Sequence, residues 1–172
     1  MTNSASSSPI EHRRERLYIS PSLGSENSLS YWWKTVHPLR VVWNFIWIYL
    51  AKYCPSLAVK RMLLRRTGMK VGGTVSVGLA VVFDLFYPEE IDIGDNSIIG
   101  YNSVVLAHEF MVDEWRKGPV CIGKNVSIGA NVTILPGVVI GDGATVSAMS
   151  LVNKDIPPGE FWGGVPVRNL KP

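Results

Sequence analysis

The sequence is poor in the features that mark several common classes of protein. Its two cysteines, Cys54 and Cys121, lie far apart in unlike surroundings, so no disulfide framework is expected and a reducing, cytoplasmic compartment is favoured. The formal net charge of +3 is too small to indicate a nucleic-acid partner. No apolar run follows an early basic start, so no secretory signal peptide is expected. The apolar stretch 41–51 is far shorter than the about 20 residues of a transmembrane helix.

The 172 residues suit one domain, and their main feature is a period of six. An aliphatic residue returns at every sixth position from residue 122 to residue 152, namely at Ile122, Ile128, Ile134, Ile140, Val146 and Val152. Asn or Gly, which tolerate a left-handed backbone, stand three places after the first four of them. This period fits neither a helix nor an alternating strand. It predicts a triangular parallel β-helix, with a short strand on each face and a turn at each corner.

The same pattern occurs upstream, where it is interrupted twice. It runs through Val71 and Val77 to Phe83, and it resumes from Ile93 to Val105. The spacing from Val105 to Ile122 is not a multiple of six, which predicts that a loop, residues 109–119, leaves the coil there. We therefore expect a mainly β fold, with the β-helix over residues 69–158 and a C-terminal tail over residues 159–172.

Two segments precede the coil. Residues 1–30 are rich in serine and are predicted to be flexible or draped over the fold. Residues 31–68 are predicted to form two helices separated near Pro55, with many aromatic residues in the first and basic residues in the second. Two roles for these helices are compatible. They close the open end of the β-helix, or residues 31–66 lie on the inner face of a membrane as a peripheral contact.

His108 is the candidate catalytic residue. A lone histidine in an apolar strand is usually a core residue, but the hexad register stops just before this one. The other two histidines, His12 and His37, lie outside the coils. A zinc enzyme on such a coil needs three histidine ligands for each metal, so no metal is expected. Cys121 lies within a strand with no histidine known to be near, which argues against a nucleophilic role.

Hexads of the form aliphatic–Gly–x–Asn–Val–x, the histidine before a loop, and the sequences of residues 153–158 and 163–168 together resemble the hexapeptide-repeat acyltransferases. The resemblance covers about residues 69–170, and its branch is that of the maltose and galactoside O-acetyltransferases. It implies a left-handed coil, a homotrimer with active sites between subunits, and acetyl-CoA as co-substrate. The helices before the coil are similar to those of an uncharacterised acetyltransferase subgroup.

The resemblance also implies roles for individual residues. His108 matches the family's general base, which takes a proton from a hydroxyl or amine of a sugar or sugar-lipid acceptor in a direct transfer. Glu109 is the nearest carboxylate to hold the second ring nitrogen, although this requires a bend because adjacent strand residues face opposite ways. The residues matched to CoA contacts are Gly129, Ala130, Ala148, Asn153, Lys154 and Arg168. Asp84 and Trp115 are the candidate acceptor contacts. A non-catalytic coil that serves as a scaffold remains the alternative.

Overall fold

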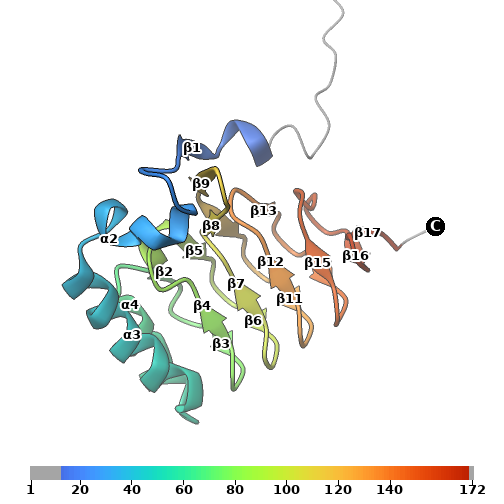
Figure 1. The fold of residues 1–172 in the computed structure, drawn as a ribbon. Coiled ribbons are helices and arrows are strands. Elements are labelled where there is room, and N and C mark those ends of the chain that lie inside the picture. Colours follow the sequence, from blue (N-terminus) through green and yellow to red (C-terminus); the bar gives the residue numbers. More distant parts are fainter. Residues whose placement is uncertain (1–12, 171–172) are drawn as a thin grey trace, which may run out of the picture.

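The computed structural model describes residues 13–170, and three sheets, parallel except for the last strand of the second, form the faces of a triangular coil (Figure 1). The first face contains β2 (Lys70–Val71), β5 (Ile91–Ile93), β10 (Val120–Ile122) and β13 (Val139–Ile140). The second contains β3 (Ser76–Val77), β6 (Ile98–Ile99), β11 (Ser127–Ile128) and β14 (Thr145–Val146), followed by β16 (Phe161–Gly163) and β17 (Arg168–Asn169). The third contains β4 (Val82–Phe83), β7 (Val104–Val105), β12 (Thr133–Ile134) and β15 (Leu151–Val152). The chain visits the three faces in turn, as a period of six requires.

The interior of the coil consists of the residues that define the period. All six aliphatic residues of the hexads from 122 to 152 are at most 3% exposed. The corners need a left-handed backbone, and the residues with positive φ include Asn96, Asn102, Asn125, Asn131, Gly137 and Gly143. Short strands stack because each corner tolerates this conformation, and their shared interior excludes water.

Replacing Ile134 by alanine is expected to reduce the free energy of unfolding by about 2–5 kcal/mol. The side chain is fully buried in β12, between β7 and β15, and its loss leaves a cavity that the stacked strands cannot close. Urea denaturation at a fixed protein concentration measures the effect. The exposed Ser127→Ala on β11 is the matched control, with an expected change within about 0.5 kcal/mol.

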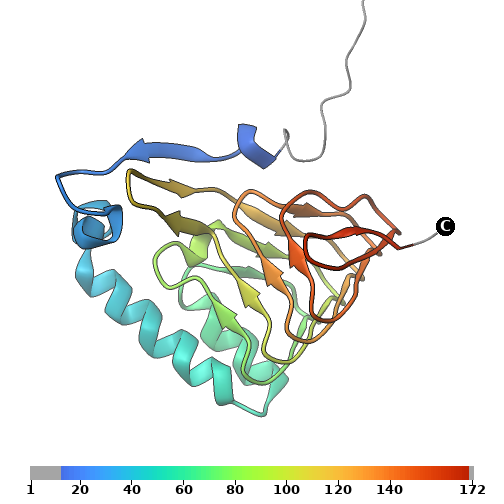
Figure 2. The ribbon, with the colours of Figure 1, turned by 45° about the vertical axis from the view of Figure 1, so that its right-hand side comes forward.

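The helical segment covers the β2–β4 end of the coil (Figures 1 and 2). It comprises the 3-10 turn η1 (Ser28–Tyr31), α2 (Trp32–Thr35), α3 (Pro38–Tyr53) and α4 (Leu57–Arg65). Pro38 occupies the first turn of α3, and the Ser56 hydroxyl caps α4 by accepting from the Val59 amide. The helix α3 contacts β4, and α4 contacts β2 and β3. In residues 13–170 no helix is both long and apolar enough to cross a bilayer.

The segment before the helices was predicted to be flexible or draped over the fold, and residues 13–30 are draped over it. The loop is a hairpin of β8 (His108–Phe110) and β9 (Glu114–Lys117), and β1 (Tyr18–Pro21) pairs antiparallel with the outer edge of β9. Arg16 also forms an ion pair with Asp155, with 2.5 Å between its Nη2 and the carboxylate. A free strand edge and these charges therefore fix residues 13–30, which the composition argument could not reveal. Residues 1–12, also predicted to be flexible, lie outside the described residues.

A further short helix interrupts the coil between its first two turns. This is η2 (Pro88–Glu90), which lies between the turn after β4 and the start of β5. The insertion accounts for the first break in the hexad pattern. Residues 84–87 are the part of it that directly follows the third-face strand β4.

Candidate active site

One corner of the coil brings together residues that are far apart in the sequence. Asp84, Leu106, Leu135 and Asn153 each follow directly the last residue of a third-face strand. The register pairs Phe83 with Val105, Val105 with Ile134, and Ile134 with Val152, so these four positions form one row along the edge. Neighbouring strands lie about 4.8 Å apart, which places the rung of Leu106 about 10 Å from the rung of Asn153. His108, two residues after Leu106, therefore lies on the same edge as the predicted CoA contact at Asn153.

Asp84 holds the His108 ring. Its Oδ2 lies 2.5 Å from His108 Nδ1 and also accepts from the Ala107 amide at 2.7 Å. Its Oδ1 accepts from the amides of Phe86 and Tyr87 at 2.8 and 2.9 Å. The carboxylate is thus completely buried and accepts hydrogen bonds from four donors. Burial by itself raises the pKa of the Asp84 carboxyl, but the hydrogen bond and charge of His108, with the backbone amides, outweigh it and hold the pKa below its ordinary value.

This contact fixes the protonation pattern of the imidazole. An ionised carboxylate only accepts hydrogen bonds, so His108 Nδ1 carries the proton that points at Asp84. In the neutral ring Nε2 then has a free lone pair, which is the atom that a general base uses. The His108 side chain is 13% exposed, so the ring is not sealed inside the coil.

Aromatic side chains hold the ring from its other sides. The centroids of Phe86 and Phe110 lie 4.7 and 4.9 Å from that of His108, and Tyr87 lies 5.9 Å away. No role was predicted for these three residues from the sequence. The signal for them is the aromatic run beside Asp84, together with the loop position that faces it.

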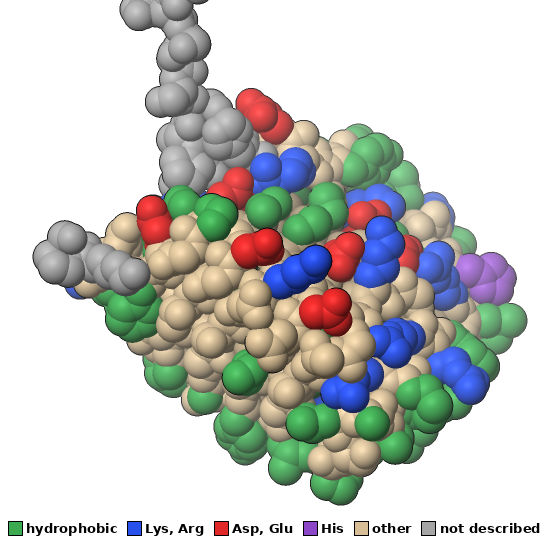
Figure 3. All heavy atoms as spheres, turned by 180° about the vertical axis from the view of Figure 1, so that it is seen from behind, with side chains coloured by type: hydrophobic (Ala, Val, Ile, Leu, Met, Phe, Trp, Pro, Cys, Tyr) green, Lys and Arg blue, Asp and Glu red, His purple; other side chains and the backbone are tan. Residues whose placement is uncertain are grey.

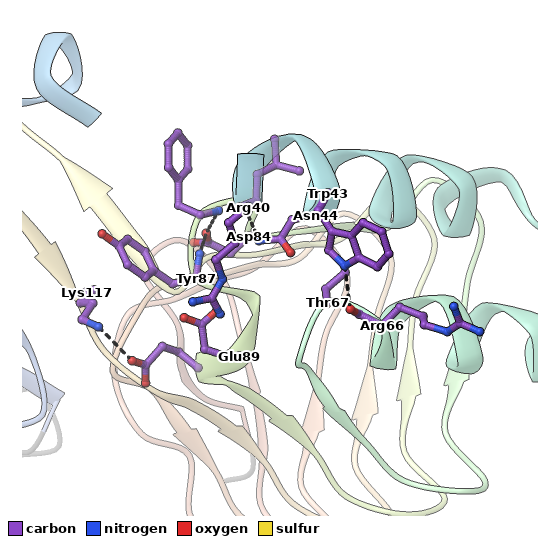
Figure 4. Close-up of polar contacts among 12 residues, drawn as sticks. Arg40, Trp43, Asn44, Arg66, Thr67, Asp84, Tyr87, Glu89 and Lys117 are labelled. Atoms are coloured by element: carbon purple, nitrogen blue, oxygen red, sulfur yellow. Dashed lines mark hydrogen bonds and ion pairs between the residues drawn. The ribbon is translucent and has the colours of Figure 1, made fainter. Parts of the chain in front are cut away.

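The helical segment supports the same turn. The Asn44 side chain reaches from α3 toward the chain beside Asp84 and donates to the Leu85 carbonyl at 2.9 Å (Figure 4). The Tyr87 hydroxyl donates to the Thr35 carbonyl at 3.3 Å. Asn44 is only 1% exposed, which is explained by this hydrogen bond because a buried amide needs a partner. The position of Asp84 therefore depends on the helices as well as on the coil.

Two of the predicted roles are corrected by this geometry. The carboxylate on the second ring nitrogen is Asp84 and not Glu109, which lies 3.0 Å from Arg13 instead. The physical reason is that Glu109 follows His108 directly in β8, so the two side chains point to opposite faces of the strand. Asp84 was predicted to contact the acceptor substrate. Its side chain is instead buried against His108, and both carboxylate oxygens already accept hydrogen bonds.

Trp115 also differs from its prediction as an acceptor contact. The residue is 7% exposed, because its ring stacks on Tyr87 with 5.9 Å between the centroids and packs against Tyr18 at 5.5 Å. In this chain Trp115 therefore fixes the hairpin to the aromatic cluster and offers no open ring face to a sugar.

The predicted CoA contacts lie on both borders of the third face. Lys154 and Arg168 line one pocket together with residues 164–167, and Lys154 Nζ lies 5.5 Å from the Trp162 ring centroid. Asn153 Oδ1 is buried and has no hydrogen-bond partner among residues 13–170. A pocket lined by two cations, next in sequence to a buried acceptor without a partner, fits a ligand that brings both phosphates and N–H donors, as CoA does.

The remaining three predicted contacts lie at the corner before the third face. A Cβ on Gly129 would come within 2.5 Å of the Ala148 amide nitrogen, and Ala130 O accepts from the Met149 amide. Stacking of the coil therefore requires a glycine at position 129 whether or not a ligand binds. Among residues 13–170 no cluster of three or more His, Cys, Asp or Glu could hold a metal ion.

Comparisons with known proteins identify the family of the chain. Residues 121–154 match the family model described as bacterial transferase hexapeptide (six repeats). The chain is 53% identical over 143 residues to a Bacillus subtilis protein named "Putative acetyltransferase YvoF", which covers 83% of each chain.

Solved structures extend the likeness to the fold. A maltose O-acetyltransferase from Clostridium difficile is 26% identical with a TM-score of 0.60, covering 78% of this chain and 88% of that one. A galactoside acetyltransferase in complex with coenzyme A is 25% identical with a TM-score of 0.61, covering 96% of this chain and 90% of that one. The chain therefore belongs to the hexapeptide-repeat transferases, as a CoA-dependent acetyltransferase built on a left-handed parallel β-helix.

Proposed function

We propose that this enzyme transfers the acetyl group of acetyl-CoA directly to a hydroxyl or amine of a sugar or sugar-lipid acceptor, with His108 as the general base. The observation that carries the proposal is the hydrogen bond between Asp84 and His108 Nδ1, which leaves Nε2 free to take a proton. The names of the similar maltose and galactoside acetyltransferases support a sugar as the acceptor class.

The step balances without a covalent enzyme intermediate. As the acceptor oxygen or nitrogen attacks the thioester carbonyl, its proton passes to His108 Nε2. The C–S bond then breaks, and the imidazolium returns the proton to the departing thiolate, so that acetylated acceptor and CoA leave. Asp84 stabilises the imidazolium while it exists, because a buried carboxylate interacts strongly with a charge that develops beside it.

The CoA phosphates are assigned to Lys154 and Arg168, and a CoA amide or amine donor to Asn153 Oδ1. Each of Lys154→Ala and Arg168→Ala is expected to raise KM for acetyl-CoA by about 10–100-fold, as expected for a lost charge-assisted hydrogen bond, with kcat little changed. Initial rates against acetyl-CoA concentration measure this split. Lys124→Ala removes an exposed lysine that lies outside this pocket and is the control. Equal KM values for all three variants would contradict the assignment.

We place the enzyme in the cytoplasm as a homotrimer. The edge that carries His108 and Asn153 borders one face of the coil, where a neighbouring subunit would close the site. The free thiols of Cys54 and Cys121 fit a reducing compartment. Light scattering on the purified protein tests the trimer.

The central experiment is a CoA-release assay with acetyl-CoA and a panel of sugars, amines and membrane extracts, run on the wild type and on His108→Ala. Release that depends on an acceptor and on His108 supports the proposal. A scaffold predicts no thioester cleavage with any acceptor and no effect of the substitution. That result would overturn the enzymatic mechanism while leaving the fold unaffected.

A further inference from the structure

The outer surface of the helical segment is apolar, and no part of residues 13–170 covers it. Helix α3 buries Asn44, Ile48 and Ala51, which lie along one line of the helix. Most of its other apolar side chains are open to solvent. Eight of these are 45–72% exposed, namely Leu39, Val42, Trp43, Phe45, Ile46, Tyr49, Leu50 and Tyr53. A contiguous apolar surface on this scale marks an interaction site.

The charge of the same segment has one sign. Residues 27–83 contain eight Lys and Arg and no Asp or Glu, whereas the rest of the chain has nine Lys and Arg against 14 Asp and Glu. The positive excess of the whole chain therefore lies in the helices and the first coil. In Figure 3 the lower right of the molecule, on the side of the helices, shows Lys and Arg among hydrophobic side chains with no acidic side chain between them.

Basic side chains of the helical segment lie against its aromatic rings. Lys34 Nζ lies 5.2 Å from the Trp33 ring centroid, and the Arg66 guanidinium lies 5.3 Å from that of Trp47. Both cations are exposed. Indole rings flanked by Lys and Arg match the headgroup region of a bilayer, where the rings lie at the interface and the cations meet anionic lipid.

We propose that the outer surface of α2, α3 and α4 docks on an anionic phospholipid bilayer. At 16 residues α3 is about 24 Å long, which is too short to cross a bilayer. It packs on α4 and β4, so its outer side would lie along the membrane surface. Self-association through this surface would bring two basic faces together, which like-charge repulsion opposes, whereas anionic lipid complements the charge. The proposal is independent of the acetyl-transfer mechanism. It does, however, bring the active site near the membrane, because Asn44 and Thr35 bond the helices to the turn of Asp84.

The test is co-sedimentation of the full chain with vesicles of phosphatidylcholine alone or mixed with phosphatidylglycerol. Wild-type protein is expected to pellet with the mixed vesicles and to be released by salt. Phe45→Gln/Tyr49→Gln/Leu50→Gln is expected to weaken binding by about tenfold or more, because it removes apolar contact. Ile98→Gln/Tyr101→Gln, two residues of similar exposure on the coil, is the control that keeps binding.

A second pair of variants separates local charge from total charge. Lys34→Glu/Arg66→Glu is expected to weaken binding by on the order of tenfold, while Arg14→Glu/Lys124→Glu, with the same change in net charge at exposed sites elsewhere, leaves it nearly unchanged. Thermal unfolding confirms that each variant is folded. The proposal would be overturned if the wild type did not bind mixed vesicles at low salt, or if the apolar variant bound them as well as the wild type does. If the wild type did not bind vesicles and the apolar variant formed a smaller oligomer, the surface would instead be an interface with a second copy of the chain.

Discussion

Substitution of His108 by alanine is expected to lower kcat for acetyl transfer by about 10²–10⁴-fold, the usual contribution of a positioned general base. In the neutral form of the wild-type ring Nε2 is the unprotonated nitrogen, because Nδ1 donates to Asp84. Without the ring, the attacking hydroxyl or amine must lose its proton to water, and the departing thiolate has no acid beside it. The CoA-release assay at saturating acetyl-CoA and acceptor measures the loss.

The same variant is expected to bind CoA as the wild type does, because the assigned phosphate contacts lie two rungs away at Lys154 and on β17. Isothermal titration calorimetry with CoA checks this point, and a melting curve checks the fold. His37→Ala is the matched control, since His37 only caps the start of α3. Full activity of His108→Ala would show that another group takes the proton or that the reaction needs no base.

The hexad positions could be predicted because their signal is local and repeated. Each inward aliphatic residue and each corner Asn or Gly contributes the same small preference many times, and the buried residues of the coil are those that the period identifies. His108 was identified for a related reason, since the end of the hexad register is visible in the sequence. Neither inference required knowledge of how the coils stack.

The partner of His108 could not be found by looking at its neighbours in the sequence. Asp84 precedes it by 24 residues, one turn of the coil earlier, and the insertion around η2 lengthens that turn. The signal was nevertheless present. Phe83 and Val105 are both inward positions that end a run of hexads, and aligning them brings Asp84 and Leu106 to adjacent rungs. Sequence adjacency favoured Glu109, but alternation along a strand directs it away from the ring.

The contacts of the N-terminal segment with the hairpin had no such signal. An antiparallel ladder between β1 and β9 depends on backbone groups, which every residue carries, so composition does not identify it. The burial of Trp115 follows from that same packing, since Tyr18 of β1 contacts its ring. A loop that is an isolated excursion in the sequence thus forms two strands, β8 and β9, of a small three-stranded sheet in the fold.

Asp84→Asn is expected to lower kcat by on the order of 10³–10⁴-fold while leaving KM for acetyl-CoA nearly unchanged, because it removes the carboxylate that sets the tautomer. One orientation of the amide keeps the hydrogen bonds from Phe86 and Tyr87 but turns its NH₂ group toward Ala107 and His108. The ring nitrogen Nδ1 must then accept, so the proton moves to Nε2 and the base is lost. The opposite orientation would point the NH₂ group at the backbone amides of Phe86 and Tyr87. Leaving these two buried donors without an acceptor costs more free energy than leaving only the Ala107 amide without one.

In this variant we also expect a changed pH dependence of the free energy of unfolding, which a merely structural change would not produce. The pKa of Asp84 lies below its ordinary value, so the carboxylate stabilises the fold above that ordinary value and its contribution is lost as the pH falls toward the lowered pKa. Asp84→Asn should therefore unfold more easily near neutrality and lose less further stability on acidification than the wild type does.

Asp92→Asn, at an exposed position of β5, is the matched control for both measurements. The ¹⁵N chemical shifts of the ring report the tautomer directly, with the proton on Nδ1 in the wild type and on Nε2 in Asp84→Asn. An unchanged kcat together with a changed tautomer would show that catalysis does not depend on the hydrogen bond between Asp84 and His108. An unchanged tautomer would mean that Asp84 does not orient the base, and the proposed proton transfer would then lack its support.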